Sequence, residues 1–259
     1  AAGRLGARVA FIGRVGDDAF GGMQRDSLAA SGVDVSRLAA DANEPTGTAV
    51  ILVGDDGQNS IIVTPAANNC VTPACIASAE DLIARSDVVL LQLEIPLESV
   101  EAALDIAKAK GVPAILDAGP AQRIPAAMIA KAAVVSPNET EAEALTGIAV
   151  HSLDSAREAA RALLAMGAPE ALMKLGAMGS FWTDGREEEF VPAFSVRAVD
   201  TTAAGDAFTA AYACVRGAMP VREALRFANA TGALAAMVAG AQPSMPSRAA
   251  VEAFLAERG

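Results

Sequence analysis

The chain has 259 residues, and 53% of them are hydrophobic, which is enough to bury the core of one sizeable α/β domain. It carries 31 acidic residues against 20 lysines and arginines, so its formal net charge is −11. Such an acidic surface repels phosphate backbones, and we therefore expect no nucleic-acid partner.

The apolar runs and the cysteines argue against two further classes, membrane proteins and zinc-binding proteins. The sequence contains neither a signal-peptide pattern nor an apolar run of about eighteen residues, so we expect a cytoplasmic protein without a membrane segment. Its three cysteines, Cys70, Cys75 and Cys214, lack the clustered spacing of a zinc site. We interpret them as free thiols in a reducing compartment.

The first 64 residues predict a strand, a helix and a hairpin. We expect a strand at 8–12, a loop at 13–18 and a helix at about 20–30 that Gly32 ends. Apolar residues alternate at 46–53 and 60–64 on either side of an Asp-Asp-Gly turn at 55–57, which predicts a β-hairpin. A hairpin inside an α/β pattern is an excursion from the main sheet, and so a candidate flap or dimer edge.

From residue 76 onward, apolar strands alternate with helices. This pattern indicates a mostly parallel sheet covered on both faces, in a single α/β domain spanning 1–259. The expected strands are 88–93, 113–117, 133–136 and 171–175, followed by a second hairpin of 180–183 and 189–191. The expected helices are 76–84, 97–110, 125–131, 139–146, 154–166, 205–216, 221–239 and 247–258.

Polar residues follow four of the strands. Glu94, Asp117, Asn138 with Glu141, and the segment 200–206 each come directly after an apolar stretch. Ligands of open α/β sheets bind at the carboxyl ends of strands, so these residues are candidates for one site. Taken singly, each also fits an ordinary loop or helix start. In particular, Asn138 and Glu141 match a helix cap.

The segment 200–206, Asp-Thr-Thr-Ala-Ala-Gly-Asp, is the most informative of these. Small residues before a helix let a ligand approach the backbone, and the first amides of a helix favour anions. Asp206 would stand at the opening of this anion site as a base, although a first-turn acid can also serve only the helix dipole. An anion site beside a base indicates phosphoryl transfer.

Competing chemistries lack their residues. His151 is the only histidine and falls in an expected loop, which argues against a Ser-His-Asp or Cys-His mechanism. The sequence has no P-loop motif and no G-x-G-x-x-G after a strand. Phosphate would then be held by the 201–205 turn and by Gly176 and Gly179, although ordinary turn chemistry explains those two glycines equally well.

Four motifs resemble those of the ribokinase-type (phosphofructokinase-B) carbohydrate kinases. The segment 200–206 is similar to the C-terminal signature of that family, and 136–143, Ser-Pro-Asn-Glu-Thr-Glu-Ala-Glu, to its N-x-x-E motif. The segments 92–100 and 240–244 are closer to the ribose-phosphorylating members than to fructokinases or adenosine kinases. The resemblance implies a three-layer α/β/α fold with a mostly parallel sheet and a small β-hairpin lid at about 46–64.

The same resemblance implies roles for individual residues. Asp206 would take the proton of the sugar's primary hydroxyl, the amides of Ala203, Ala204 and Gly205 would stabilise the transferring phosphoryl group, and Glu94 would bind the sugar. ATP would be bound by the part spanning about 136–259, with Mg²⁺. Its nucleotide-binding residues would be Asn138, Glu141, Lys174, Leu175, Gly176, Ala177, Met178, Gly179, Gly205 and Asn229.

Family members also hold K⁺ beside the anion site and often form homodimers through the lid, and we expect both here. The matching K⁺ positions are Asp200, Thr202, Ala235, Val238, Gly240 and Ser244. The family pattern normally begins with a strand carrying a sugar-binding aspartate and with a Gly-Gly-Lys-Gly-Ala-Asn segment, and neither is found in these 259 residues. Because the later motifs are intact, we expect a fragment rather than a degenerate kinase.

The expected reaction is ATP-dependent phosphorylation of a sugar, with D-ribose as the leading acceptor. Fructose, a nucleoside or a keto-deoxy sugar acid is the alternative acceptor. A nucleotide or sugar binder without catalysis is a second alternative, and a plain dehydrogenase is a third that the missing glycine fingerprint disfavours.

Overall fold

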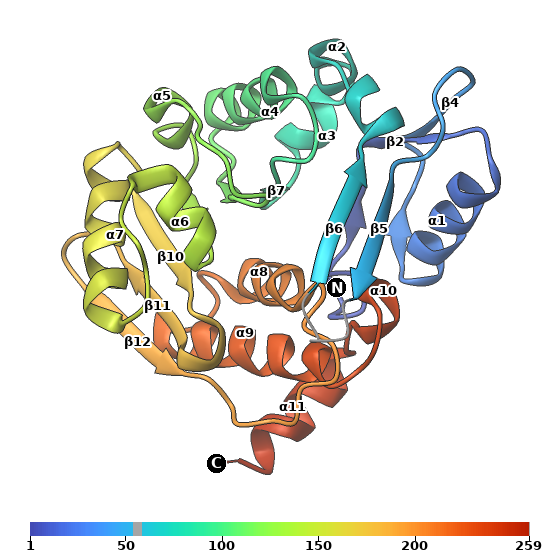
Figure 1. Ribbon diagram of the computed structural model, residues 1–259. Coiled ribbons are helices and arrows are strands. Elements are labelled where there is room, and N and C mark those ends of the chain that lie inside the picture. The colour runs from blue at the N-terminus through green and yellow to red at the C-terminus, as the bar shows by residue number, and fades with distance from the viewer. Residues whose placement is uncertain (54–58, 259) are drawn as a thin grey trace.

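A six-stranded sheet forms the centre of the computed structural model, which describes residues 1–53 and 59–258 (Figure 1). The strand order is β12-β11-β10-β9-β8-β7. Strands β7 to β10 are parallel, and β11 and β12 are added as an antiparallel hairpin. Their bounds are β7 Val89–Leu91, β8 Ala114–Asp117, β9 Val134–Ser136, β10 Glu170–Lys174, β11 Gly179–Thr183 and β12 Glu188–Pro192.

Helices cover both faces of this sheet (Figure 1). One layer contains α2 Pro73–Ala77, α3 Glu80–Ala84, α4 Leu97–Lys110, α5 Ala126–Ile129, α6 Glu139–Thr146 and α7 Leu153–Ala165. The other contains α8 Ala204–Val215, α9 Val221–Ala236 and α11 Arg248–Ala256, and the short α10 Ala241–Ser244 follows α9. This is the three-layer α/β/α arrangement that the sequence predicted.

Neighbouring residues of one strand belong to different cores. On β8, Ile115 packs in the cluster with α8, α9 and α11, whereas Leu116 packs in the cluster with α4 and α7. Both side chains are fully buried. Side chains alternate across a strand, so an apolar strand can serve two cores only if both faces of the sheet are covered.

The N-terminal part forms small separate sheets. Strand β1 (Val9–Ala10) pairs with β3 (Val33–Asp34), and β2 (Gly13–Gly16) with β4 (Leu38–Asp41), both in parallel. Helix α1 (Ala19–Ala30) packs against β2 and β3. The lid hairpin, β5 (Thr48–Val53) with β6 (Asn59–Thr64), is antiparallel as expected, and a 3₁₀ turn, η1 (Ala66–Cys70), follows it. The expected turn at 55–57 lies outside the described residues.

Three sequence expectations differ most from the observed elements. The expected loop at 13–18 begins with strand β2, because the chain changes partner from β3 to β4 after β1. The expected helix 76–84 is two helices, and between them the Ser78 hydroxyl donates to the Cys75 carbonyl at 2.7 Å. The helix expected over 221–239 ends at Ala236, whose carbonyl accepts the amides of Val199 and Asp200 instead. Strands β3 and β4 and helix α10 were not predicted.

The helices of the described segments were also compared with the length and hydropathy that a bilayer requires. None of them is both long and apolar enough to span one.

Candidate active site

The start of α8 is built differently from a typical helix start. Its first flanking residue, Ala203, has φ +61° and ψ 11°, a left-handed conformation, and its methyl group offers no capping oxygen. The Ala204 amide donates to Thr201 O at 3.2 Å. Among the backbone hydrogen bonds of the described residues, none is donated by the Gly205 or Asp206 amide. This end of α8 can therefore accept an anionic ligand.

A strained backbone at this point is consistent with a ligand site. A left-handed conformation costs a residue with a Cβ roughly 1–2 kcal/mol and persists only where the surrounding structure enforces it. Here, the Asp200 carboxylate supports the turn, accepting the Thr202 amide at 2.9 Å and the Gly240 amide at 2.8 Å. The turn is thus fixed before any ligand binds.

Two carboxylates, those of Asp206 and Glu94, interact electrostatically at the start of α8. Burial among protein atoms is the largest cause that raises the pKa of Asp206, and the Asp117 carboxylate raises it further. Burial also raises the pKa of Glu94, with added contributions from Asp206 and Asp117. Both residues keep solvent-exposed surface, so a ligand can reach them. The structure therefore brings Glu94, which follows β7, into electrostatic contact with Asp206 at the start of α8.

Asn138 and Glu141 form a complete capping box at the start of α6. Asn138 Oδ1 accepts the Glu141 amide at 2.9 Å, and Glu141 Oε2 accepts the Asn138 amide at 2.7 Å. Burial is the main cause that raises the pKa of Glu141, and Lys174 opposes it. A Cβ on Gly119 would lie only 2.9 Å from Glu141 Oε1. A glycine at this position of the loop after β8 therefore leaves room for the Glu141 carboxylate. The prediction of a helix cap is confirmed, and the hydrogen bonds of this cap also fix the position of the Glu141 side chain.

Lys174, the last residue of β10, pairs with two carboxylates, those of Asp117 and Glu141. Its Nζ lies 2.5 Å from Asp117 Oδ1 and 3.6 Å from Glu141 Oε2, and the three side chains are almost fully buried. Thr209 on α8 donates to the other oxygen of Asp117 at 2.6 Å. Thr209 was missed from the sequence, although its position three residues after Asp206 places it on a neighbouring part of the same helix face.

The residues after β10 follow the expected order along the chain. Leu175 is buried, and Gly176, Ala177 and Met178 form a 3₁₀ turn, η2. A Cβ on Gly179, which has φ +121°, would lie 2.1 Å from Val191 O. This close approach of β12 accounts for Gly179 by itself.

Asn229 is buried on α9. Its Nδ2 donates to Val191 O at 3.0 Å and Pro192 O at 3.3 Å, so the amide ties α9 to β12. Its expected role in binding the nucleotide stays a prediction.

The six expected K⁺ positions surround the connection from α9 to α10. Asp200 contacts Gly240 as described above, and its amide reaches the end of α9. The Val238 amide donates to Ala235 O at 3.1 Å, and Ser244 Oγ donates to Ala241 O at 2.7 Å. The structure thus gathers these positions beside the turn that precedes α8.

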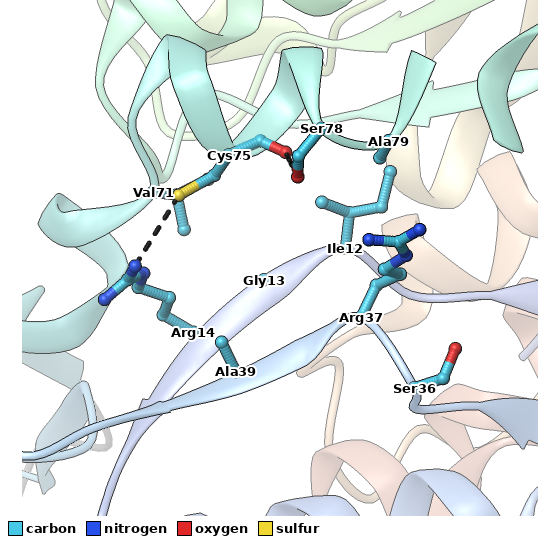
Figure 2. A pocket seen from close by; sticks show the side chains of 10 residues that line it. All are labelled: Ile12, Gly13, Arg14, Ser36, Arg37, Ala39, Val71, Cys75, Ser78 and Ala79. Carbon is cyan, nitrogen blue, oxygen red and sulfur yellow. Dashed lines mark hydrogen bonds between the residues drawn. The ribbon is translucent and has the colours of Figure 1, made fainter. Parts of the chain in front are cut away.

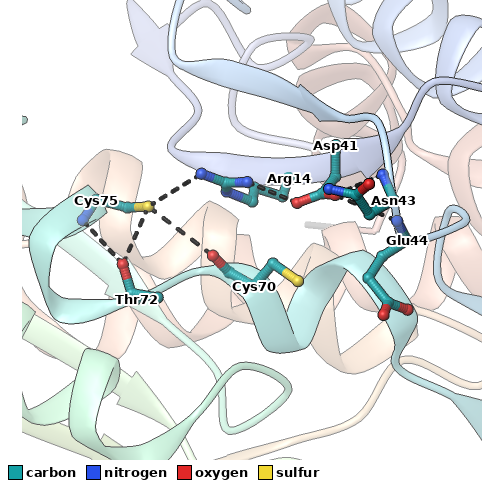
Figure 3. A network of polar contacts seen from close by, with 7 residues as sticks. All are labelled: Arg14, Asp41, Asn43, Glu44, Cys70, Thr72 and Cys75. Atoms are coloured by element: carbon teal, nitrogen blue, oxygen red, sulfur yellow. Dashed lines mark hydrogen bonds and ion pairs between the residues drawn. The ribbon is translucent and has the colours of Figure 1, made fainter.

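A hollow of about 240 Å³ lies between β2, β4 and α2 (Figure 2). The Arg14 guanidinium joins Asp41 at 2.6 Å to the Cys75 sulfur at 3.7 Å (Figure 3). A hydrogen bond from the Thr72 hydroxyl is the largest cause that lowers the pKa of Cys75, and Arg14 contributes. This hollow shares no residue with the site at the strand ends. Cys70, Cys75 and Cys214 are free thiols, as expected.

Asp18 is a further residue that sequence reasoning missed. It caps α1 through the Gly21 amide at 2.8 Å and also accepts the Thr46 amide at 2.8 Å and the Thr46 hydroxyl at 2.7 Å. These hydrogen bonds fasten the lid hairpin to α1. An Asp two residues before the expected start of the helix at about 20 was the available signal.

Comparison with known proteins agrees with this geometry. The fold and the anion site beside a carboxylate define a phosphotransferase of the α/β class. The sequence profile described as pfkB family carbohydrate kinase matches residues 1–248. The chain therefore belongs to the pfkB family of carbohydrate kinases.

Individual relatives cover nearly all of the chain. A ribokinase of Haemophilus influenzae is 38% identical over 256 residues, which are 98% of this chain and 84% of the relative. The structure of Arabidopsis thaliana ribokinase complexed with ribose and ATP superimposes with a TM-score of 0.92 at 35% identity, covering 98% of this chain and 84% of that one. An E. coli structure described as a ribokinase II in complex with ATP and Mg²⁺ gives a TM-score of 0.84 at 26% identity, covering 99% and 85%.

Proposed function

We propose that this protein transfers the γ-phosphoryl group of ATP to the primary hydroxyl of D-ribose, which yields D-ribose 5-phosphate. The open, uncapped start of α8 beside Asp206 is the observation that carries this proposal. Relatives described as ribokinases, one of them solved with ribose and ATP, support ribose as the acceptor. Residues 1–259 act as one kinase domain, with the lid at about 46–64 and the nucleotide-binding part at about 136–259.

Asp206 is the proposed general base. Its carboxylate lies in the first turn of α8, next to amides that have no backbone acceptor, so base and anion site are adjacent. Glu94, whose charge interacts with that of Asp206, binds the sugar hydroxyls. The amides of Ala203 and Gly205 stabilise the charge on the phosphoryl group, whereas the amide of Ala204, which was also expected to do so, already donates to Thr201 O at 3.2 Å. Phosphoryl transfer depends mainly on such positioning and electrostatics.

The nucleotide lies along the residues that follow β9 and β10. Asn138 and Glu141 are fixed by their capping box, and Glu141 presents a buried carboxylate toward Lys174. Mg²⁺ supplies positive charge to the phosphates of ATP, and it commonly binds through one or two carboxylates, waters and substrate phosphates. Residues 174–179 and Asn229 line the rest of the nucleotide site. ATP and Mg²⁺ are both present in the E. coli relative.

K⁺ binds at the six positions beside the α8 turn. Asp200 supplies a carboxylate there, and the loop from 235 to 244 supplies backbone carbonyls. A cation at this place would steady the turn that carries Ala203. Turnover in K⁺ should therefore exceed turnover in Na⁺ at equal ionic strength, and equal rates would contradict this part of the proposal.

The lid mediates a homodimer. Val50 on β5 and Ile62 on β6 are cross-strand partners, and each is more than half exposed. Exposed apolar pairs on a hairpin are suited to burial against a second copy. Light scattering of the wild type and of Val50→Asp tests this assignment, with a shift from dimer to monomer expected in the variant. The working compartment of such an enzyme is the cytoplasm, where ATP is supplied.

A coupled assay of ADP release over a panel of sugars tests the function. With K⁺ and Mg²⁺ present, we expect ribose to give the highest kcat/KM. A preference for fructose, a nucleoside or a keto-deoxy sugar acid would support kinase activity but contradict ribose as the acceptor. Binding of ATP or ribose by calorimetry without turnover for any sugar would contradict catalysis and leave a binding protein.

A further inference from the structure

Lys174 is a buried cation that lies directly against the open start of α8. Its side chain is only 11% exposed. A Cβ placed on Gly205 would lie 3.6 Å from its Nζ, so the ammonium group borders the backbone of the anion site. An ammonium group has three N–H donors. Asp117 accepts a hydrogen bond from one of them, and Glu141 is an ion-pair partner at 3.6 Å, so at least one donor is left for a ligand at the start of α8.

Three elements fix the position of this ammonium group. The Lys174 backbone amide donates to Pro137 O at 2.9 Å, which fixes the end of β10. Asp117, from the end of β8, holds Nζ with one oxygen and accepts the Thr209 hydroxyl of α8 with the other. The flexible side chain of lysine is therefore already ordered by β8, β10 and α8.

A second lysine in the chain provides the contrast. Lys131 also pairs with two carboxylates, Glu101 at 2.7 Å and Asp105 at 2.8 Å, but these carboxylates are 44% and 55% exposed. The Lys174 network is buried, and a buried ion pair is often no more stabilising than apolar residues of the same volume. Stability alone does not explain why a charged pair occupies this place.

We propose that Lys174 is a further catalytic residue, whose ammonium group binds the transferring γ-phosphoryl group, and that Asp117 and Thr209 are its positioning residues. This inference rests on the proposed function. In the transfer, the sugar oxygen forms a bond to the γ-phosphorus while the bond from that phosphorus to the β–γ bridging oxygen breaks. The hydroxyl proton goes to Asp206, and ADP leaves. The ammonium group of Lys174 offsets the negative charge of the phosphoryl oxygens.

Replacement of Lys174 tests the contact with the γ-phosphoryl group. We expect Lys174→Met to lower kcat about 10²- to 10³-fold, the range for loss of one preorganised donor. By calorimetry, its affinity for ATP should fall about tenfold and that for ADP much less, because only ATP has a γ-phosphate. Lys174→Arg should retain part of the activity. The matched control is Lys131→Met, which removes a lysine held by two carboxylates and should leave kcat and both affinities unchanged.

Replacement of Asp117 or Thr209 tests whether these residues position the Lys174 ammonium group. Asp117→Asn should lower kcat about tenfold in the wild type and add little in the Lys174→Met background, because residues that act as a unit are not additive. Thr209→Val, which keeps the shape of the side chain, should lower kcat several-fold with KM for the sugar unchanged. Full additivity of Asp117→Asn with Lys174→Met, or wild-type kcat in Thr209→Val, would overturn the positioning roles.

Equal weakening of ATP and ADP binding in Lys174→Met, or an unchanged kcat, would overturn the catalytic role. Should Lys174→Met fail to fold by circular dichroism, the ATP and ADP affinities of Lys174→Arg and Thr209→Val decide in its place. Unchanged ATP-to-ADP ratios in both of those variants would also overturn the role. If the wild type phosphorylates none of the sugars, the proposed function fails, while the comparison of ATP with ADP still decides whether Lys174 meets a γ-phosphate.

Discussion

Helices α6 and α8 both begin at the edge of the sheet where the parallel strands end, yet their first turns are built in opposite ways. At α6, Asn138 and Glu141 satisfy each other's backbone amides in a capping box. At α8, Ala203 offers no side-chain oxygen, and the amides of Gly205 and Asp206 have no backbone acceptor among the described residues. A capped start presents a fixed carboxylate, and an uncapped start presents free amides. The site needs both, and Lys174 lies between them.

Among the variants of the α8 start, Asp206→Asn should lower turnover the most. Loss of a general base costs about 10²- to 10⁴-fold in turnover, and nucleotide affinity should change little. Because the pKa of Asp206 is raised in the folded chain, its ionised form destabilises that chain above the pKa of the unfolded state, and the variant should have a slightly higher Tm at pH 7. Steady-state kinetics and thermal unfolding measure both effects.

Asp81→Asn is the control for this variant. Asp81 is likewise an acidic residue in the first turn of a helix, α3, but it lies away from the site. If Asp206 serves only the dipole of α8, the two variants should resemble each other, with slightly lower Tm values and normal turnover.

Gly205→Ala should narrow the anion site without disturbing the fold. The added methyl would meet Lys174 at ordinary contact distances of 3.6 and 3.8 Å, so Tm should stay unchanged or rise. The methyl would also hinder close approach of a phosphoryl group to the amides, and we expect kcat to fall about tenfold or more. Gly22→Ala on α1, where a Cβ has open space, is the control that should alter Tm only. Normal kcat in Gly205→Ala would contradict the anion site.

The pH profile should sharpen the assignment of Asp206. A base must be deprotonated to act, and burial together with Asp117 raises the pKa of this group above its ordinary value of 3.8. The acidic limb of kcat/KM should therefore lie at higher pH than that of an ordinary aspartate. Removal of the Asp117 charge in Asp117→Asn should move that limb to lower pH. A limb that does not move would show that another group titrates.

Asn138→Ala removes the cap of α6 and should have the smallest effect on turnover. Loss of the cap costs about 1 kcal/mol, which corresponds to a fall in Tm of about 2–4 °C in a chain of this size. Because Glu141 loses its fixed position, KM for ATP should rise several-fold. The control is Ser152→Ala, which removes the equivalent cap of α7 away from the site. It should lower Tm similarly, and a parallel rise in KM for ATP there would contradict a special role for Asn138.

The bounds of several elements follow from local sequence alone. Helix α4 begins after Pro96 and ends before Gly111, which has φ +69°, and these are the bounds of 97–110 expected from the sequence. The bounds of α6 were also predicted, because its cap and its final Gly147 are local signals. By contrast, β3 and the end of α9 depend on partners distant in sequence, β1 and the Val199 and Asp200 amides, so no local pattern could reveal them.

The sequence by itself determined the family motifs, the alternation of strands and helices, and the small residues that open the start of α8, because each of these is written in contiguous residues. Only the tertiary structure decided that Lys174, Asp117 and Thr209 meet. They come from β10, β8 and α8, and the residue numbers differ by 57 for Lys174 and Asp117 and by 92 for Asp117 and Thr209. Burial gives this contact its importance, since charges are brought together away from water only when the sheet and both helix layers have closed around them.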